Sequence, residues 1–91
     1  MGEIHIMRLD KYLKVSRLIK RRTIAKEACD TGRVTINGKT AKAGSEVKEN
    51  DLIEIAFAAK KVKARILSVR EVVRKDEAAS MYEIMEGAEI E

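Results

Sequence analysis

The residues of this chain best placed to do chemistry are its lysines and arginines. From Arg8 to Lys48, twelve Lys or Arg residues stand against four Asp or Glu residues, a local net charge of +8. From Glu49 to Glu91, seven cations stand against ten acids, a local net charge of −3. A dense basic surface attracts polyanions and speeds their encounter, and nucleic acid is the commonest cellular polyanion. The first half of the chain is therefore predicted to bind nucleic acid.

The composition gives little support to other kinds of chemistry. Cys29 is the only cysteine and His5 the only histidine, so neither a multi-cysteine zinc site nor histidine-based catalysis is expected. Cys29 is expected to be a small core residue. No pairing of carboxylates suggests acid–base catalysis, so we expect a protein that is not an enzyme and that holds no metal and no cofactor. No segment resembles a secretory signal or a membrane span, which predicts a cytoplasmic protein without a membrane partner.

The first candidate site is a set of cations on two predicted helices and the turn that joins them. The set comprises Arg8, Lys11, Lys14, Arg17, Lys20, Arg21, Arg22 and Lys26. Apolar residues occupy the inward faces of both helices, so these cations must project outward together. The alternative is an ordinary solvated face, but ordinary surfaces mix the two signs of charge.

The second candidate site is the tip of a predicted hairpin and its flanks. Its residues are Arg33, Asn37, Gly38, Lys39 and Lys42. Backbone N–H groups and cations at such a tip are good donors to phosphate. The same residues would equally suit a tight turn with soluble flanks, so both interpretations stay open.

The aromatic residues restrict the kind of nucleic-acid binding. Only Tyr12, Phe57 and Tyr82 are present, too few for a platform that stacks several bases. Recognition is therefore predicted to use phosphates, 2′-hydroxyls and the shape of structured RNA. Tyr12 could either stack on a base beside the cations or pack on Leu9.

Local patterns predict the elements that carry these residues. Helices are predicted over Leu9–Val15, where Leu9 and Leu13 share a face, and over Arg22–Asp30, which Gly32 terminates. The second helix begins with three cations where a capping Ser, Thr or Asp would stabilise it. A phosphate partner would explain that choice of residues.

The rest of the chain is predicted to supply a sheet and a last helix. Strands are predicted at Val34–Ile36 and Lys39–Ala41, which are joined by the turn-forming pair Asn-Gly, and at Leu52–Phe57 and Val62–Val69. A terminal helix is predicted over Asp76–Met85. The expected fold is a small α+β domain in which two short helices pack on a mostly antiparallel sheet.

The domain organisation follows from these elements. Residues 1–7 are expected to be an N-terminal extension, because Met7 resembles a second start; residues 8–57 form the RNA-binding domain, and residues 58–91 complete the same domain with a strand and an acidic helix. The segment 76–91 holds six acids and no cation. It is expected either to face away from RNA or to dock a basic protein.

The order of several short motifs resembles the S-four RNA-binding domain. The motifs are Arg8-Leu9-Asp10-Lys11-Tyr12-Leu13, Arg17, Arg22-Thr23-Ile24-Ala25, Gly32-Arg33-Val34, Asn37-Gly38-Lys39 and Asp51. The resemblance covers about residues 8–57. Among stand-alone chains, the sequence is similar to the ribosome-associated quality-control factor P family and, less closely, to small ribosome-binding heat-shock proteins.

The resemblance implies a function in translation. A member of this family would bind large-subunit rRNA and peptidyl-tRNA on a stalled, split large ribosomal subunit, while a partner tailing factor extends the nascent chain with alanine. We expect this chain to be a monomer. The signature arginines of the family fall on Arg8 and Arg22, with Arg17 in support. In the family the equivalent of Arg8 directly follows the initiator Met, whereas six residues precede Met7 here.

Three other functions are left open by the sequence. The chain could be a heat-shock-type factor that recycles stalled large subunits. It could be a protein-interaction module that regulates a partner through its acidic segment. It could also be the detached RNA-binding arm of a base-modifying enzyme.

Overall fold

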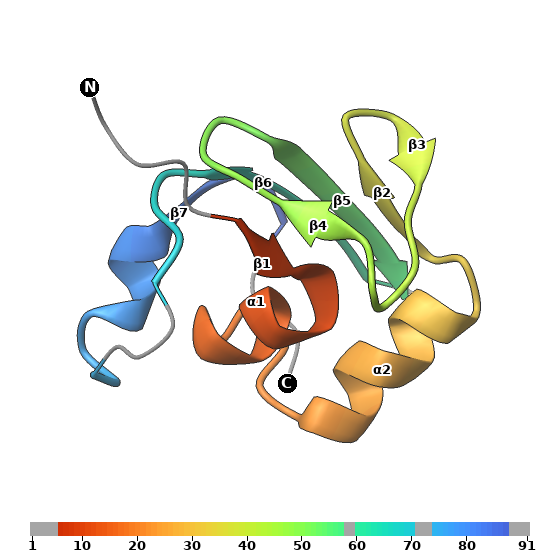
Figure 1. Cartoon of the computed structure of the whole chain (residues 1–91), viewed down its shortest axis with the longest axis horizontal. Helices are drawn as coiled ribbons and strands as arrows, with labels where there is room; N and C mark the ends of the chain where they lie inside the picture. Colours follow the sequence, from red (N-terminus) through yellow and green to blue (C-terminus); the bar gives the residue numbers. More distant parts are fainter. Residues whose placement is uncertain (1–5, 58–59, 71–73, 88–91) are drawn as a thin grey trace.

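A five-stranded antiparallel sheet with two helices on one face forms the body of the molecule (Figure 1). The computed structural model describes residues 6–57, 60–70 and 74–87. The helices are α1 (Leu9–Val15) and α2 (Arg22–Asp30), and the main sheet contains β2 (Val34–Ile36), β3 (Lys39–Thr40), β5 (Leu52–Phe57), β6 (Lys60–Ile66) and β7 (Tyr82–Glu86). The small strands β1 (Met7–Arg8) and β4 (Glu46–Val47) form a separate antiparallel pair, and the 3-10 turn η1 (Ala78–Met81) precedes β7.

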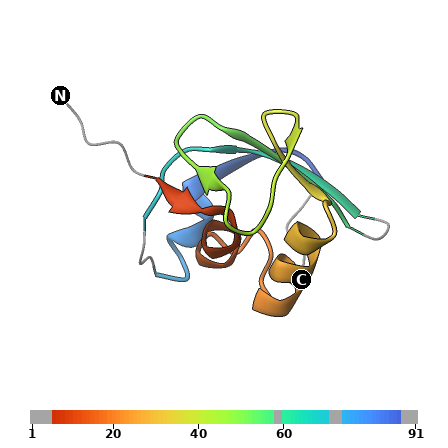
Figure 2. The same ribbon diagram turned by 45° about the vertical axis from the view of Figure 1, so that its right-hand side comes forward.

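The strand order is β3-β2-β5-β6-β7, and the register places apolar residues on the face that the helices cover. Val34 pairs with Ile55, which in turn pairs with Val62, and all three are buried. Figure 2 shows both helices on the same side of this sheet. The α+β fold predicted from the sequence is therefore confirmed.

The two helices have the bounds that the sequence predicts. Leu9 and Leu13 of α1 are fully buried, as the spacing of four residues on one face requires. In α2, Ala25, Ala28 and Cys29 are buried, so Cys29 is a core residue as expected. These inward stripes turn the charged residues of both helices to the surface.

Two turns with positive φ angles also lie where the sequence predicts them. Gly32 ends α2 at φ 71°, and the amide of Arg33 donates to the carbonyl of Ala28, 3.0 Å away, as in a Schellman cap. Asn37 and Gly38 join β2 to β3 at φ 52° and 85°. Both values suit the type I′ turn that the Asn-Gly pair predicts.

The predicted terminal helix is wrong. Residues 78–81 form only a 3-10 turn, and Tyr82–Glu86 form a strand in which Tyr82 pairs with Ile66 and Ile84 with Ala64. The apolar spacing over residues 78–85 fits a helix, but Tyr82 and Ile84 also alternate with Glu83. Backbone pairing with the open edge of β6 stabilises the extended form instead.

Other boundaries also differ from the prediction. The strand predicted at Val62–Val69 begins at Lys60 and ends at Ile66. It ends there because the amides of Leu67 and Ser68 donate to the carbonyl of Met81, which lies outside the strands. The sequence places Met7 in the N-terminal extension, but in the structure Met7 pairs with Val47 and is only 4% exposed. The fold therefore includes Met7.

Candidate nucleic-acid interface

An open hollow of about 780 Å³ lies between α1 and α2. Its lining consists of Arg8, Asp10, Lys11, Lys14, Val15, Arg22, Lys26 and Ala43. Five of these residues are cations and one is an acid. We call this hollow the basic groove; its positive charge suits a phosphate backbone better than a small apolar ligand.

Backbone hydrogen bonds fix the first side of the basic groove. The amides of Leu9 and Asp10 donate to the carbonyls of Ser45 and Ala43, at 2.7 and 3.2 Å, and so tie the start of α1 to the loop before β4. At the same end, Arg8 Nη2 donates to Asp10 Oδ2 at 3.2 Å. The Arg8 side chain remains 64% exposed, so this contact holds the guanidinium at the rim without burying it.

The N-terminus of α2 forms the second side of the basic groove. Arg21 is the N-cap, its side chain makes no capping hydrogen bond, and the first turn contains no acid. The positive end of the helix dipole therefore adds to the charge of Arg22 and Lys26. Such a start is unfavourable for an isolated helix and favourable for binding an anion.

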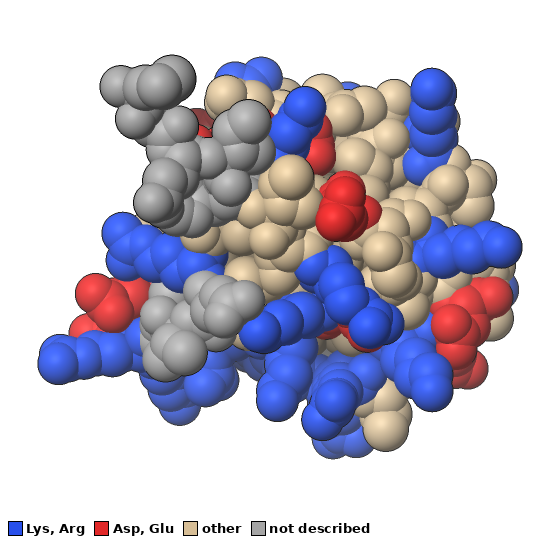
Figure 3. All heavy atoms as spheres, in the orientation of Figure 1, with Lys and Arg blue, Asp and Glu red and all other residues tan. Residues whose placement is uncertain are grey.

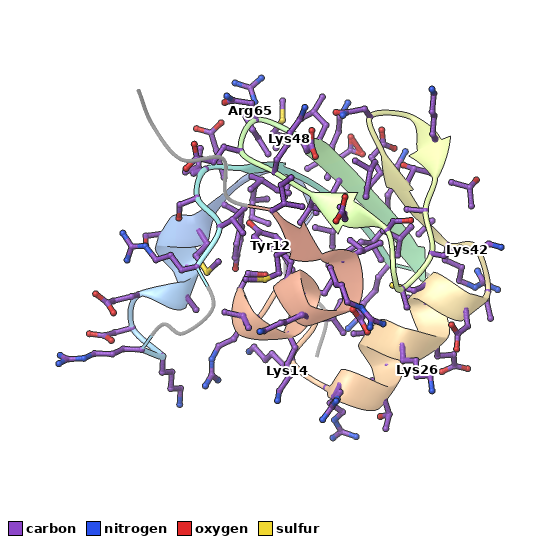
Figure 4. All side chains as sticks on the ribbon, viewed as in Figure 1. Tyr12, Lys14, Lys26, Lys42, Lys48 and Arg65 are labelled. Carbon is purple, nitrogen blue, oxygen red and sulfur yellow. The ribbon has the colours of Figure 1, made fainter. Side chains whose placement is uncertain are left out.

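Figure 3 shows how the basic surface extends beyond the groove. Lys and Arg side chains gather over the lower part of the view, where α1 and α2 lie, while the described residues of the upper part are mostly uncharged, with scattered Lys, Arg, Asp and Glu. In Figure 4, Lys14 and Lys26 are labelled on the two helices, whereas Lys48 and Arg65 are labelled at the opposite, upper edge. On this face the positive charge is therefore concentrated where the two helices lie.

The predicted site residues are all exposed, but the fold divides them among several places. Arg8, Lys11, Lys14, Arg22 and Lys26 line the basic groove. Arg17 and Lys20 line a different hollow on the other side of the end of α1. Arg21, Arg33, Lys39 and Lys42 are exposed outside both hollows.

Asn37 is exposed at the hairpin tip, yet its side chain is engaged within the protein. Its amide nitrogen donates to Asp51 Oδ1 at 3.0 Å, and its oxygen accepts from the amide of Leu52 at 2.9 Å. The side chain thus ties the hairpin turn to the start of β5. Any role of this tip in RNA binding then depends on the backbone and on neighbouring cations.

Tyr12 does not stack on an external partner. It is fully buried, and its hydroxyl donates to the carbonyl of Met81 at 2.8 Å. Burial, and to a smaller extent the neighbouring Tyr82, raises the pKa of Tyr12 well above its ordinary value. The packing alternative of the sequence analysis is confirmed, with the hydrogen bond to the C-terminal segment as an addition.

Lys75 was missed as a site residue by sequence reasoning. It lines the hollow that contains Arg17 and Lys20, together with Ser16, Ala78, Ala79 and Tyr82. In the sequence it directly precedes the cation-free segment 76–91, for which the sequence predicts either a face turned away from RNA or a docking surface for a basic protein. Only the folding of residues 74–81 back against the end of α1 reveals the proximity.

The described residues show neither a metal-binding cluster nor a membrane-spanning helix. Within residues 6–57, 60–70 and 74–87, no three His, Cys, Asp or Glu side chains are grouped so that they could hold a metal ion. Among the described helices, none combines the length and the apolar character needed to cross a bilayer.

The fold and the basic groove define an RNA-binding domain of the S4 class. The S4 domain family matches residues 7–53, which is more than half of the chain. The structure is similar to the trimeric structure of heat shock protein 15 from Vibrio cholerae, with a TM-score of 0.78 and 27% identity over 89% of this chain and 83% of that one. It is also similar to the solution structure of the hypothetical protein HP1423, with a TM-score of 0.73 and 32% identity over 88% and 98% of the two chains.

Comparison with curated relatives identifies the family within the S4 class. The RQC P-site tRNA stabilizing factor of Halalkalibacterium halodurans is 60% identical over 78 residues, which cover 86% of this chain and 89% of the relative. The factor of the same name from Bacillus subtilis is 53% identical over 79 residues, 87% of this chain and 92% of the relative. The chain therefore belongs to the S4-domain family of RQC P-site tRNA stabilizing factors.

Proposed function

We propose that the protein acts in ribosome-associated quality control by binding RNA on stalled large ribosomal subunits. The observation that carries the proposal is the basic groove, where five cations from β1, α1 and α2 surround a space open to a phosphate backbone. The name shared by its relatives, P-site tRNA stabilizing factor, supports tRNA as one ligand. The second ligand that we propose is large-subunit rRNA.

In this mechanism the protein acts as a clamp and not as a catalyst. The groove cations hold the phosphates of a peptidyl-tRNA, while cations outside the groove hold those of an rRNA helix. Charge-assisted hydrogen bonds to phosphate position the nucleic acid without reading its sequence. The tRNA then stays in the peptidyl position while a partner tailing factor adds alanine to the nascent chain. One monomer bridging the two RNAs suffices for this role.

Cross-linking in cells tests the proposal. The protein would be cross-linked by ultraviolet light and purified under denaturing conditions, and the attached RNA would be sequenced. We expect reads confined to tRNA and to one region of large-subunit rRNA. Reads distributed over mRNA would contradict the proposal.

The heat-shock-type recycling factor is the second candidate. It is supported by a relative from Aeromonas salmonicida, named heat shock protein 15 homolog, which is 34% identical over 65 residues. Alanine tailing of a stalled reporter separates the two functions. Deletion of the gene for this protein should abolish the tail if the protein stabilises the tRNA during tailing, and should leave the tail in place if it only recycles subunits.

A further inference from the structure

A second hollow of about 350 Å³ lies where the C-terminal segment meets the end of α1. Its lining contains three cations, Arg17, Lys20 and Lys75, and no acid. The other lining residues are small or apolar apart from Ser16 and Tyr82, whose side chains are buried. The cations that line this hollow thus come from two parts of the chain that are distant in sequence.

The backbone at Arg17 is unusual for an arginine. Arg17 follows the C-cap of α1 at φ 63°, the left-handed conformation that glycine adopts without strain. A side chain at such a position carries a conformational cost, and residues held in this way cluster at functional sites. The side chain of Arg17 is thus present although glycine would suit the turn better.

The C-terminal segment is fixed firmly against this turn. The carbonyl of Met81 accepts hydrogen bonds from Tyr12 Oη and from the amides of Leu67 and Ser68, at 2.8, 2.8 and 3.2 Å. Met81 is itself fully buried. Because Tyr12 lies in α1, this carbonyl joins the helix that precedes Arg17 to the turn that follows Lys75.

The acids of the same turn do not cancel the charge of the hollow. Asp76 and Glu77 follow Lys75 in sequence, but neither lines the hollow. Glu77 Oε1 accepts a hydrogen bond from the backbone amide of Arg74, 3.3 Å away, which directs this carboxylate to its own backbone. Lys75 is therefore the charged residue of this turn that lines the hollow together with Arg17.

We propose that Arg17 and Lys75, with Lys20 beside them, form a second phosphate-binding subsite for RNA. It adjoins the basic groove, because Val15 lines the groove and Ser16 lines the second hollow. RNA could thus contact both sides of the end of α1 at once. The inference rests on the proposed function and extends it, since it assigns an RNA contact to Lys75, a residue outside the predicted RNA-binding set.

Two substitutions test the subsite from its two sides. Arg17→Gly removes the guanidinium and relieves the left-handed strain, so the melting temperature should not fall, whereas affinity for large subunits carrying peptidyl-tRNA should drop about tenfold. Lys75→Glu should weaken binding by at least as much and lower the salt dependence by about one phosphate contact. Lys48→Glu is the matched control, an exposed lysine at the opposite edge of Figure 4, and should change affinity less than threefold.

The outcomes separate this subsite from the basic groove. If Arg22→Ala weakens binding while both Arg17→Gly and Lys75→Glu bind as the unaltered protein does, the second subsite is disproved and the proposed function stands. If Arg22→Ala also binds normally, the proposed function itself fails. Equal losses in Lys75→Glu and Lys48→Glu would show a general effect of charge, which would likewise overturn the subsite.

Discussion

The side-chain amide of Asn37 donates a hydrogen bond to the carboxylate of Asp51, 3.0 Å away and fourteen residues further along the chain. Asp51 is only 7% exposed, and its second oxygen accepts from the amide of Lys48 at 3.0 Å. One carboxylate therefore holds together the hairpin tip and the turn before β5. This arrangement makes Asn37 a residue of the scaffold, whatever else it contacts.

The first prediction concerns stability at this pair. Asn37→Ala removes hydrogen bonds to Asp51 and to the amide of Leu52, and it places alanine at φ 52°. We expect the free energy of unfolding to fall by about 2 kcal/mol, measured by urea denaturation. Asn37→Gly loses the same bonds without the strain and should cost about 1 kcal/mol less.

RNA binding by the same variants shows how Asn37 acts. If the residue only supports the turn, affinity measured well below the melting temperature should change less than threefold in both variants. A loss of about tenfold in both would instead show a direct contact of the side chain with RNA.

The second prediction concerns the basic groove. Arg22→Ala removes an exposed cation at the start of α2 and should weaken binding to large subunits carrying peptidyl-tRNA by about tenfold or more. The fold should not suffer, because alanine is a better helix former than arginine and the side chain is exposed. Arg65→Ala, at the opposite edge of Figure 4, is the matched control. Equal affinities of the two variants would contradict the assignment of the groove.

The third prediction concerns ionic strength. If about five phosphates are contacted, affinity should fall roughly 10²-fold between 50 and 200 mM salt. Arg22→Ala should reduce the slope of log affinity against log salt by about one contact. Fluorescence anisotropy or filter binding over a salt series gives both slopes. An affinity independent of salt would contradict the electrostatic mechanism.

The sequence predicts those parts of the fold that local chemistry determines. Leu9 and Leu13 define the inner face of α1, Gly32 ends α2, and the Asn-Gly pair closes the first hairpin. Each of these signals spans only a few residues. The positions of the groove cations follow from the same signals, because a helix that buries one face exposes the other.

The parts that the sequence does not predict depend on pairing between distant segments. Residues 78–85 suit a helix as well as a strand, and the edge of β6, where Ile66 meets Tyr82, selects the strand. Met7 is a core residue only because β1 pairs with β4, which lies forty residues further along the chain and places Met7 opposite Val47. Lys75 joins Arg17 for the same reason, since no local pattern links the two residues.

The fourth prediction tests the pairing of β6 with β7. Gly87 follows β7 at φ 81°, and a Cβ atom there would collide with the backbone carbonyl oxygen of Lys61. Gly87→Ala should therefore lower the free energy of unfolding by more than 1 kcal/mol. Gly44→Ala is the control, because a Cβ atom at Gly44 meets nothing within 4 Å and should cost little. Equal stability of the two variants in thermal denaturation would contradict the position of the β7 end.

The last prediction concerns the buried thiol of Cys29 and its pH dependence. Burial, with smaller contributions from the carboxylates of Asp10 and Asp30, raises the pKa of this thiol to about 11 from an ordinary value of 9.0. The unfolded chain therefore loses this proton at a lower pH than the folded chain does. The stabilisation is complete below pH 9 and is lost as the pH rises from about 9 to 11, at up to about 1.4 kcal/mol per pH unit.

Comparison with Cys29→Ala isolates this contribution, because Tyr12, whose pKa is also raised by burial, is the same in both proteins. Urea denaturation at pH 8, 9 and 10 should show that the unaltered protein loses stability faster than the variant above pH 9. A thiol reagent at pH 8 should react slowly with the native protein and rapidly with the urea-unfolded chain, because Cys29 is only 1% exposed and protonated when folded. Rapid labelling of the native protein, or identical pH profiles of the two proteins, would contradict the burial of Cys29 beneath α2.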